Sequence, residues 1–245
     1  MQAMIFAAGL GTRLKPLTDD KPKALVEVNN MALLEINIKR LKKYGITNIV
    51  VNVHHFAEKI KQFLKDNNNF NCNIKISAET DKLLDTGGGL KKAENLFVKN
   101  EPILICNVDV LSDIDLNDLT QYHLKNNKLA TLAVMNRNTS RYLLFDDENI
   151  MCGWENVKTN EIIMSRNIAK YNRFAFSGIH IVSPEIFKFL ELDVYSITKK
   201  YIELSKENQI IAYKHDKNKW MDLGKIEQLN EAVNCFGKEY FSNLN

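Results

Sequence analysis

Short apolar runs alternate with amphipathic segments along the first 135 residues of the chain. The first run, Met4–Ala8, is continuously apolar and ends at Gly9, which is typical of a strand buried on both faces of a sheet. Residues 32–44 instead space their apolar side chains about one helical turn apart, which predicts an amphipathic helix. The same criteria predict further strands at 48–53, 73–77, 102–108 and 130–135, and further helices at 56–66, 90–98 and 115–127.

This alternation of strands and helices predicts an α/β fold, with a doubly wound, mostly parallel sheet covered by helices on both faces. In sheets of this kind, ligands bind outside the carboxyl ends of the strands. The loops that directly follow predicted strands are therefore where we expect a site. Three of these loops are candidates for such a site: residues 8–23, 78–89 and 107–113.

The pattern changes after about residue 136. Aromatic and β-branched residues dominate the short runs 141–146, 162–164 and 173–182, which indicates antiparallel strands. Around these runs the pattern predicts helices at 185–206 and 225–236 and a strand at 209–213. No stretch has the composition of a linker, so we expect one domain over residues 1–245. Its expected parts are residues of about 1–135, an inserted antiparallel lobe of about 136–224 and a C-terminal helix of about 225–240.

The balance of charges excludes several classes of protein. The chain has 33 basic and 30 acidic residues and a net charge of +3, too even for a protein that coats nucleic acid or binds a membrane surface. Its four cysteines lie far apart without a C-x-x-C pair, which argues against a zinc site or disulfide scaffold and fits reduced thiols. The sequence has no signal-peptide pattern and no run of roughly 20 apolar residues. We therefore expect a soluble, cytoplasmic protein that is monomeric or a small homo-oligomer.

The first loop combines small residues with positive charge. Gly9 and Gly11 directly follow the first strand, where small residues let backbone N–H groups approach phosphate oxygens. Four cations follow within a few residues: Arg13, Lys15, Lys21 and Lys23. The loop lacks the G-x-x-x-x-G-K-[ST] pattern, and Leu14 stands where G-x-G-x-x-G needs its third glycine. An anion site of another kind, or a glycine turn with solvated lysines, remains.

Two isolated carboxylates and a glycine run are further candidates. Asp109 follows the buried strand 102–108, and Asp222 stands between apolar residues and Gly224. Carboxylates in such positions are poorly explained by packing, although a helix cap or a turn is an alternative. The run Gly87–Gly89 opens a predicted helix, which indicates either a hinge with an N-cap or a flat surface for a ligand.

Residues 7–26 resemble the signature of the sugar-1-phosphate nucleotidyltransferase family. The matching residues are Ala-Ala-Gly-x-Gly-Thr-Arg-Leu-x-Pro-Leu-Thr from Ala7 and Lys-Pro-Lys-Ala-Leu-Val from Lys21. The resemblance implies a Rossmann-like fold with a nucleotide-binding first part and a sugar-binding lobe. It also implies the reaction of a nucleoside triphosphate (NTP) with a sugar-1-phosphate, which gives a nucleotide sugar and pyrophosphate with Mg²⁺ as cofactor. Such in-line transfer depends on positioning and charge neutralisation, without a covalent intermediate.

The resemblance implies a role for each matching residue. Arg13 would neutralise the departing pyrophosphate, and Lys23 would hold the α-phosphate and the incoming sugar phosphate together. Asp109 and Asp222 would hold Mg²⁺, which needs only one or two protein carboxylates when phosphates and water complete its shell. The first loop would contact the triphosphate through Ala8, Gly9, Gly11 and Thr12.

The base and the sugar are less clearly indicated. In the family, the residues matching Thr86 and Gly87 lie against the base, and Glu79 falls where relatives often carry a base-reading glutamine. The Asp-Thr-Gly-Gly-Gly run and Phe176-Ser-Gly are similar to those of short uridylyltransferases that act on N-acetylmuramic acid 1-phosphate. This favours UTP and an N-acetylated amino sugar used in cell-wall or surface polysaccharide.

Other readings stay open at this point. A cytidylyltransferase for phosphocholine or a similar alcohol phosphate shares the first loop, and a non-catalytic module that senses nucleotide sugars shares the fold. On the sugar side, Leu143 and Phe176 replace the glycine and asparagine of larger relatives. Lys158 or Lys170 could replace a phosphate-binding lysine of the family, and the sequence does not choose between them.

Overall fold

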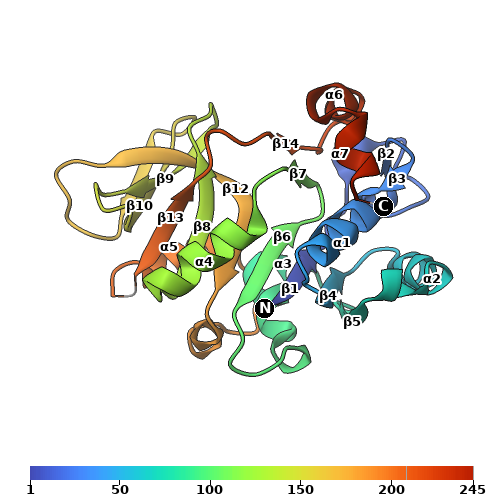
Figure 1. Cartoon of the computed structure of the whole chain (residues 1–245). Helices are drawn as coiled ribbons and strands as arrows, with labels where there is room; N and C mark the ends of the chain where they lie inside the picture. The colour runs from blue at the N-terminus through green and yellow to red at the C-terminus, as the bar shows by residue number, and fades with distance from the viewer. Residues whose placement is uncertain (208, 245) are drawn as a thin grey trace.

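A ten-stranded sheet forms the centre of the computed structural model, which describes residues 1–207 and 209–244 (Figure 1). Its parallel part runs in the order β6, β1, β4, β5, and β1 pairs in parallel with both β4 and β6. All of β1 is buried, which explains its continuous apolar run. The bounds are β1 (Gln2–Phe6), β4 (Asn48–Val53), β5 (Asn73–Ala78) and β6 (Ile103–Asn107).

Helices cover both faces of this sheet, as the sequence predicts. Ala3 and Ile5 of β1 belong to the core under α1, α2, α4 and α6, whereas Met4 and Phe6 belong to the core under α3 and α5. Alternate residues of a strand point to opposite faces, so β1 serves two cores. The helices are α1 (Leu33–Lys43), α2 (Ala57–Asp66), α3 (Asp85–Lys92), α4 (Leu116–Asn126), α5 (Ile197–Leu204), α6 (Ile226–Phe236) and α7 (Lys238–Ser242).

The second part of the chain adds an antiparallel lobe beside the parallel strands. The long strand β12 pairs antiparallel with β6 and β8, and its first residues pair with β9. β13 runs parallel to β8, and β9, β10 and β11 continue the sheet in antiparallel order. The bounds are β8 (Ala130–Met135), β9 (Arg141–Phe145), β10 (Met151–Asn156), β11 (Glu161–Met164), β12 (Asn172–Val182) and β13 (Ile210–Lys214). The predicted strand 130–135 therefore exists as β8, but β12 separates it from the parallel strands.

Short elements connect these units. The described chain also contains two-stranded sheets, β2 with β3 and β7 with β14, and short 3₁₀ helices. The strands are β2 (Glu27–Val28), β3 (Met31–Ala32), β7 (Val110–Ser112) and β14 (Trp220–Asp222). The 3₁₀ helices are η1 (Thr12–Leu14), η2 (Lys23–Leu25), η3 (Asn68–Asn71), η4 (Glu94–Leu96) and η5 (Pro184–Lys188).

Three predictions of secondary structure were wrong in detail. The helix expected at 185–206 is η5 and α5 with an irregular loop between them, and the expected C-terminal helix breaks at Gly237, which has a φ of 76°. The helix at the glycine run begins earlier, at Asp85, and contains all three glycines. β10 gave no signal in the sequence because Gly153 interrupts it; a Cβ there would lie 2.4 Å from the carbonyl oxygen of Ile163 on β11.

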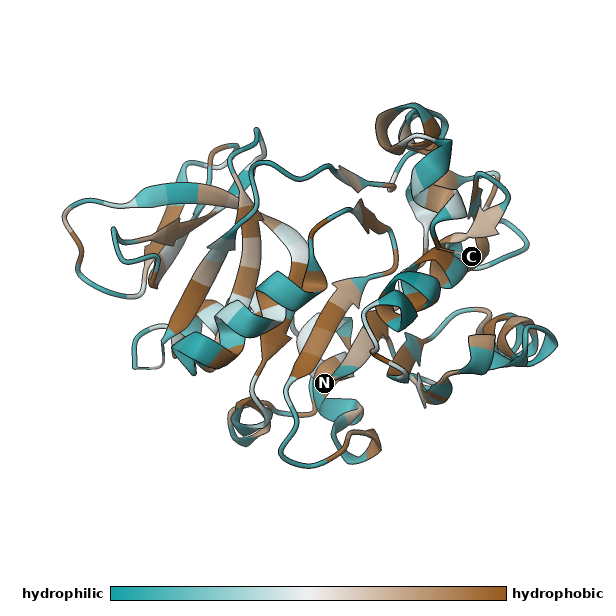
Figure 2. Cartoon of the chain, viewed as in Figure 1, coloured by the Kyte–Doolittle hydropathy of each residue, from teal (hydrophilic) through white to brown (hydrophobic). Residues whose placement is uncertain are grey.

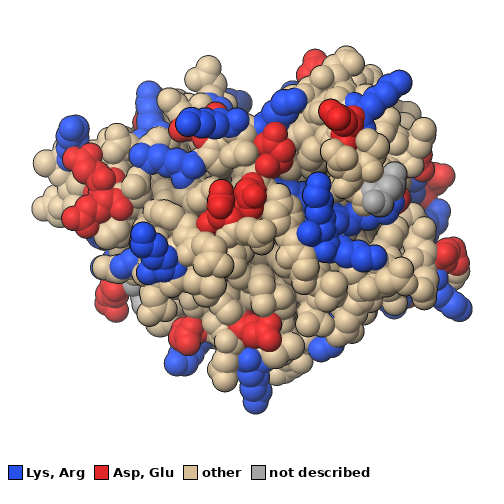
Figure 3. Space-filling model, viewed as in Figure 1, with Lys and Arg blue, Asp and Glu red and all other residues tan. Residues whose placement is uncertain are grey.

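The distribution of polar and charged residues agrees with this layering. β1 and β6 are apolar along most of their length, while the outer side of α4 is polar (Figure 2). Charges of both signs are spread over the face in Figure 3, and the largest basic group lies over α1. Within residues 1–207 and 209–244, no helix has both the length and the apolar character needed to span a bilayer.

Candidate active site

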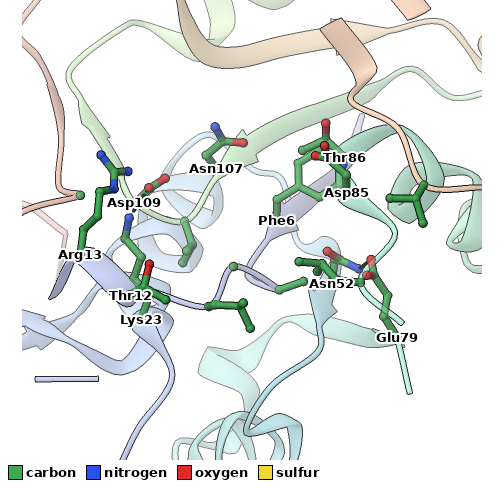
Figure 4. Close-up of a pocket in the computed structure, with 18 residues that line it drawn as sticks. Phe6, Thr12, Arg13, Lys23, Asn52, Glu79, Asp85, Thr86, Asn107 and Asp109 are labelled. Carbon is green, nitrogen blue, oxygen red and sulfur yellow. Dashed lines mark hydrogen bonds and ion pairs between the residues drawn. The ribbon is translucent and has the colours of Figure 1, made fainter. Parts of the chain in front are cut away.

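The three loops expected to carry a site meet at one cavity of about 590 Å³ (Figure 4). Residues from the loops after β1, β5 and β6 line it, and Val194 and Gly224 join them from the second part of the chain. The lining residues are Phe6, Ala8, Gly9, Leu10, Gly11, Thr12, Arg13, Lys23, Asn52, Glu79, Leu83, Asp85, Thr86, Asn107, Val108, Asp109, Val194 and Gly224. The prediction that ligands bind at the carboxyl ends of these strands thus agrees with the position of the cavity.

The first loop folds tightly around Gly11. Gly11 has a φ of 66°, and a Cβ on it would lie 3.1 Å from side-chain atoms of both Lys23 and Thr18. The Thr18 hydroxyl donates a hydrogen bond to the Gly11 carbonyl (2.9 Å), and the fully buried Leu14 anchors η1. A Cβ on Gly9, in contrast, would meet no protein atom within 4 Å. Packing therefore requires glycine at position 11, whereas close approach of a ligand would explain it at position 9.

Lys23 joins the first loop to the third. Its side chain is buried, and its ammonium group donates a hydrogen bond to Oδ2 of Asp109 within an ion pair. Figure 4 shows Arg13, Lys23 and Asp109 grouped at one side of the cavity. Two cations and a carboxylate thus share the region into which the glycine loop opens, which suits a ligand that carries several negative charges.

Asp222 lies beside Asp109 although 113 positions separate them in the sequence. β14 pairs antiparallel with β7, which places Asp222 opposite Val110, and the Leu223 amide donates to the Asp109 carbonyl oxygen (2.8 Å). A Cβ on Gly224 would lie 2.6 Å from Oδ1 of Asp222 and 2.7 Å from an Nη of Arg13. A larger residue at 224 would therefore displace one of these two charged groups from its present position.

The two aspartates fit a hard divalent cation. Oδ1 of Asp222 is buried and has no hydrogen-bond partner in the described chain. A buried carboxylate oxygen without a partner is costly, and a bound cation would relieve that cost. No group of three or more His, Cys, Asp or Glu side chains suited to a metal occurs within residues 1–207 and 209–244. A cation held here would therefore take its remaining ligands from water and phosphate, as Mg²⁺ commonly does.

The opposite side of the cavity is built around a buried carboxylate. Glu79 is only 2% exposed; its Oε1 accepts from the Asn52 side-chain amide and its Oε2 from the Leu84 backbone amide, both at 2.7 Å. Figure 4 shows Asn52 and Glu79 together, away from Arg13 and Lys23. Sequence reasoning missed Asn52. The available signal was a polar residue near the carboxyl end of β4, within an otherwise apolar strand.

The glycine run packs against other parts of the protein. A Cβ on Gly87 would lie 2.2 Å from the Tyr195 ring, one on Gly88 1.9 Å from the Asp193 carbonyl oxygen, and one on Gly89 2.7 Å from Oε1 of Glu79. Gly87, expected to contact the base, is buried under Tyr195 and does not line the cavity. Gly87 and Gly88 make room for the loop 189–196, and Gly89 makes room for the Glu79 side chain.

Thr86 does line the cavity, and its environment ties the two parts of the chain together. Its hydroxyl accepts a hydrogen bond from the Ile197 amide (2.9 Å), at the start of α5. Two backbone bonds join the same segments: the Gly87 amide donates to the Tyr195 carbonyl (2.9 Å), and the Tyr195 amide donates to the Leu84 carbonyl (3.2 Å). The position of Thr86 in the wall of the cavity therefore depends on the loop 189–196.

On the side of the antiparallel lobe, a bulge in β12 approaches the cavity. Gly178 has a φ of 71°, and a Cβ on it would lie 2.8 Å from the side-chain nitrogen of Asn107, which lines the cavity. Leu143 is buried in the core of the lobe and Phe176 packs against that core, so neither lines the cavity. The two lysines considered for phosphate binding, Lys158 and Lys170, are exposed and also lie outside its lining.

The fold is an α/β sheet with a glycine-rich loop, two cations and a carboxylate at the carboxyl ends of its parallel strands, an arrangement suited to an anionic ligand. The sequence model of the Nucleotidyl transferase family matches residues 2–239, and the chain belongs to this family.

Relatives and solved structures support the same placement. The chain is 31% identical over 234 residues to an N-acetylmuramate alpha-1-phosphate uridylyltransferase of Neisseria meningitidis serogroup B, covering 95% of this chain and 96% of the relative. It is 31% identical over 232 residues to a mannose-1-phosphate guanyltransferase of Gibberella zeae, covering 91% of this chain but 61% of that longer relative. In fold it is similar to HddC from Yersinia pseudotuberculosis, with a TM-score of 0.76 at 22% identity over 96% of this chain and 99% of that one.

Proposed function

We propose that this protein is a sugar-1-phosphate nucleotidyltransferase, with UTP as the favoured nucleotide and an N-acetylated amino sugar 1-phosphate as the favoured acceptor. The observation that carries this proposal is the group formed by the Lys23–Asp109 ion pair and the unpartnered buried oxygen of Asp222. It lies where the glycine loop meets the end of β6. In this proposal residues of about 1–135 bind the nucleotide, and about 136–224 bind the sugar.

In the proposed reaction, an oxygen of the sugar phosphate attacks the α-phosphorus of the NTP. One P–O bond forms there while the bond between the α-phosphorus and the bridging oxygen breaks, and its electron pair leaves with pyrophosphate. The backbone of Ala8, Gly9, Gly11 and Thr12 would hold the triphosphate. Arg13 would neutralise the leaving pyrophosphate, because its planar guanidinium can bind two phosphate oxygens at once.

In this proposal Lys23 acts at the reacting phosphorus. Its ammonium group is buried and held by Asp109, so it needs little reorganisation when two phosphates meet beside it. Asp109 and Asp222 are the residues that would hold Mg²⁺. The cation would neutralise negative charge on the phosphate oxygens. Its removal by a chelator would leave Oδ1 of Asp222 without a partner, whereas Asp109 would keep its ion pair with Lys23.

The preference for UTP rests on two supports. The uridylyltransferase relative matches over nearly its whole length, and the sequence shares the Asp-Thr-Gly-Gly-Gly run expected of such enzymes. Glu79 and Asn52 form the polar end of the cavity opposite the phosphate side, where we place the base together with Thr86. The Glu79 carboxylate could accept a hydrogen bond from the N3–H of uracil or from an N–H group of guanine. Because one relative is a guanyltransferase, GTP is a necessary control.

A matrix of substrates tests this proposal. Purified protein would be assayed for pyrophosphate release with UTP, GTP, CTP and dTTP, each against the 1-phosphates of N-acetylmuramic acid, N-acetylglucosamine, glucose and mannose. We expect the highest kcat/KM with UTP and an N-acetylated acceptor, and loss of activity with EDTA. A preference above tenfold for another nucleotide would refute the uridylyl assignment but not the reaction class.

Two further outcomes separate the remaining alternatives. Turnover of CTP with phosphocholine, and not with sugar phosphates, would identify a cytidylyltransferase for alcohol phosphates. Tight binding of UTP without pyrophosphate release for any acceptor would indicate a non-catalytic, nucleotide-sensing module.

A further inference from the structure

Arg137 is a charged residue of the antiparallel lobe that none of the proposed roles includes. It follows β8, is half-buried, and donates a hydrogen bond from an Nη to the Phe176 carbonyl in β12 (2.9 Å). Its guanidinium lies over the Trp220 ring, 4.0 Å from the ring centroid. Its Nε is buried and has no hydrogen-bond partner within the described chain. Arg137 is therefore held firmly while most of its N–H donors stay unused.

The stacking on Trp220 brings Arg137 to the side of β14 that carries Asp222. Residues two apart on a strand point to the same face, so Trp220 and Asp222 share one face of β14. The Trp220 indole N–H donates to the Ser177 carbonyl (2.8 Å), which fixes the ring on which the guanidinium lies. Burial lowers the pKa of Arg137 and the nearby charge of Asp222 raises it, so the two groups interact electrostatically.

Asp222 thus has an arginine from each part of the chain in its surroundings. A Cβ on Gly224 would lie close to both Oδ1 of Asp222 and an Nη of Arg13, and the charge of Asp222 acts on Arg137 of the lobe. A sugar phosphate bound by the lobe must bring its dianionic phosphate to this junction. Arg137 lies outside the lining of the cavity, as Lys158 and Lys170 do, but it is half-buried and stacks on Trp220 of β14, whereas both lysines are exposed.

We propose that Arg137 binds the phosphate group of the incoming sugar-1-phosphate; this inference rests on the proposed function. A guanidinium stacked on an aromatic ring is oriented in advance, so its planar donors can bind two phosphate oxygens with little loss of side-chain freedom. The negative charge of Asp222 partly offsets the cost of holding this cation in a half-buried position. Arg137 would thus bind the phosphate of the acceptor, as Arg13 would bind the phosphates of the NTP that leave as pyrophosphate.

Steady-state kinetics of Arg137→Ala and Arg137→Lys tests the inference, with Arg173→Ala as a matched control. Arg173 is another arginine of the lobe, lies over the Tyr142 ring at 5.2 Å, and pairs with Glu155 at 3.5 Å. We expect Arg137→Ala to raise the KM for the sugar phosphate by about tenfold or more, because the phosphate would lose its charge-assisted hydrogen bonds to the guanidinium. The KM for the nucleotide should stay within about threefold.

The expected pattern includes partial recovery. Arg137→Lys should fall between wild type and alanine, millimolar guanidinium chloride should restore part of the activity of Arg137→Ala, and Arg173→Ala should match wild type. If Arg137 only clamps β14 to β12, both KM values and the melting temperature will change together and guanidinium will not help. That result, or an unchanged KM for the sugar phosphate, overturns the inference.

Failure of the proposed function is distinguishable from failure of this inference. If wild type releases no pyrophosphate with any acceptor, the reaction class is wrong. The affinities of wild type and Arg137→Lys for N-acetylglucosamine 1-phosphate, measured by calorimetric titration, then test the role of Arg137 independently of the reaction. Equal affinity, or no binding to either protein, rejects it as a phosphate-binding residue, and weaker binding to the variant supports it.

Discussion

Replacing Gly88 by alanine tests how strictly α3 is fitted to the rest of the molecule. The added Cβ would lie 1.9 Å from the carbonyl oxygen of Asp193 and 3.0 Å from its carbonyl carbon. Both are backbone atoms, so no side-chain rotation can relieve the overlap. The loop 189–196 would have to move by about 1.5 Å, the difference between 1.9 Å and an ordinary contact of 3.4 Å.

The energetic cost follows from the bonds that hold this loop. The Gly87 amide bond to Tyr195 and the Tyr195 amide bond to Leu84 flank the overlap and would both weaken. Losing two such hydrogen bonds costs about 2 kcal/mol. Strain from overpacking adds about 1–3 kcal/mol, while the higher helix propensity of alanine returns about 1 kcal/mol. We therefore expect the free energy of unfolding to fall by about 2–4 kcal/mol, a drop in Tm of roughly 5–15 °C for a chain of this size.

Thermal unfolding followed by circular dichroism measures this effect, with two alanine variants as controls. Gly9→Ala should melt within about 2 °C of wild type, since its Cβ would meet no protein atom within 4 Å. Gly87→Ala should lose less than Gly88→Ala, because the atoms it meets belong to the Tyr195 ring, which can turn. Refutation would be a Gly88→Ala variant as stable as Gly9→Ala, or one more stable than Gly87→Ala.

Four further predictions concern the site and the core. Asp109→Asn should abolish pyrophosphate release in millimolar Mg²⁺ with an unchanged circular dichroism spectrum; activity within a few-fold of wild type would remove Asp109 from the metal site. Lys23→Ala should lower kcat by roughly 10²-fold or more if the lysine stabilises the transition state; a change in KM alone would contradict this. Glu79→Gln should cost about 1–3 kcal/mol in urea unfolding, because one acceptor of the Asn52 and Leu84 N–H groups becomes a donor; wild-type stability would contradict the buried network.

The last of the four is a loss of stability in acid. Burial lowers the pKa of His180 to about 3. The unfolded chain takes up this proton near pH 6.5 and the folded chain only near pH 3, so stability falls as the pH drops between them, by about 1.4 kcal/mol per unit. Urea unfolding at pH 7.5 and 5.5 should show a smaller difference for His180→Phe; an identical difference would contradict the assignment.

The sequence predicted the parts of the fold that depend on local pattern. The apolar run at β1 and the amphipathic segment at α1 are clear patterns. The loops after β1, β5 and β6 were expected at the same edge because these strands run parallel in one sheet, in the order β6, β1, β4, β5. Asp222 could be placed beside Asp109 only through the family resemblance. The pairing of β7 with β14 is non-local, and neither strand is long enough to give a pattern.

Other parts of the site could not be read from residue types. A glycine shows that a side chain is missing, but not which group fills the space. The run at Gly87–Gly89 therefore suggested a ligand where the structure has Tyr195, Asp193 and Glu79. Asn52 was missed because one asparagine in a strand has many possible roles until its partner, Glu79, is known.

The same glycines affect the point during synthesis at which α3, and with it one wall of the cavity, can become stable. Three consecutive glycines cost α3 about 2–3 kcal/mol relative to alanine, so this short helix has little stability of its own. The bonds that hold it come from residues that emerge from the ribosome much later; the Thr86 bond to Ile197 spans 111 positions. A nascent chain that has only reached β8 has its parallel strands but lacks the partner of Thr86. The wall of the cavity that contains Thr86 can therefore form only after Ile197 has been synthesised.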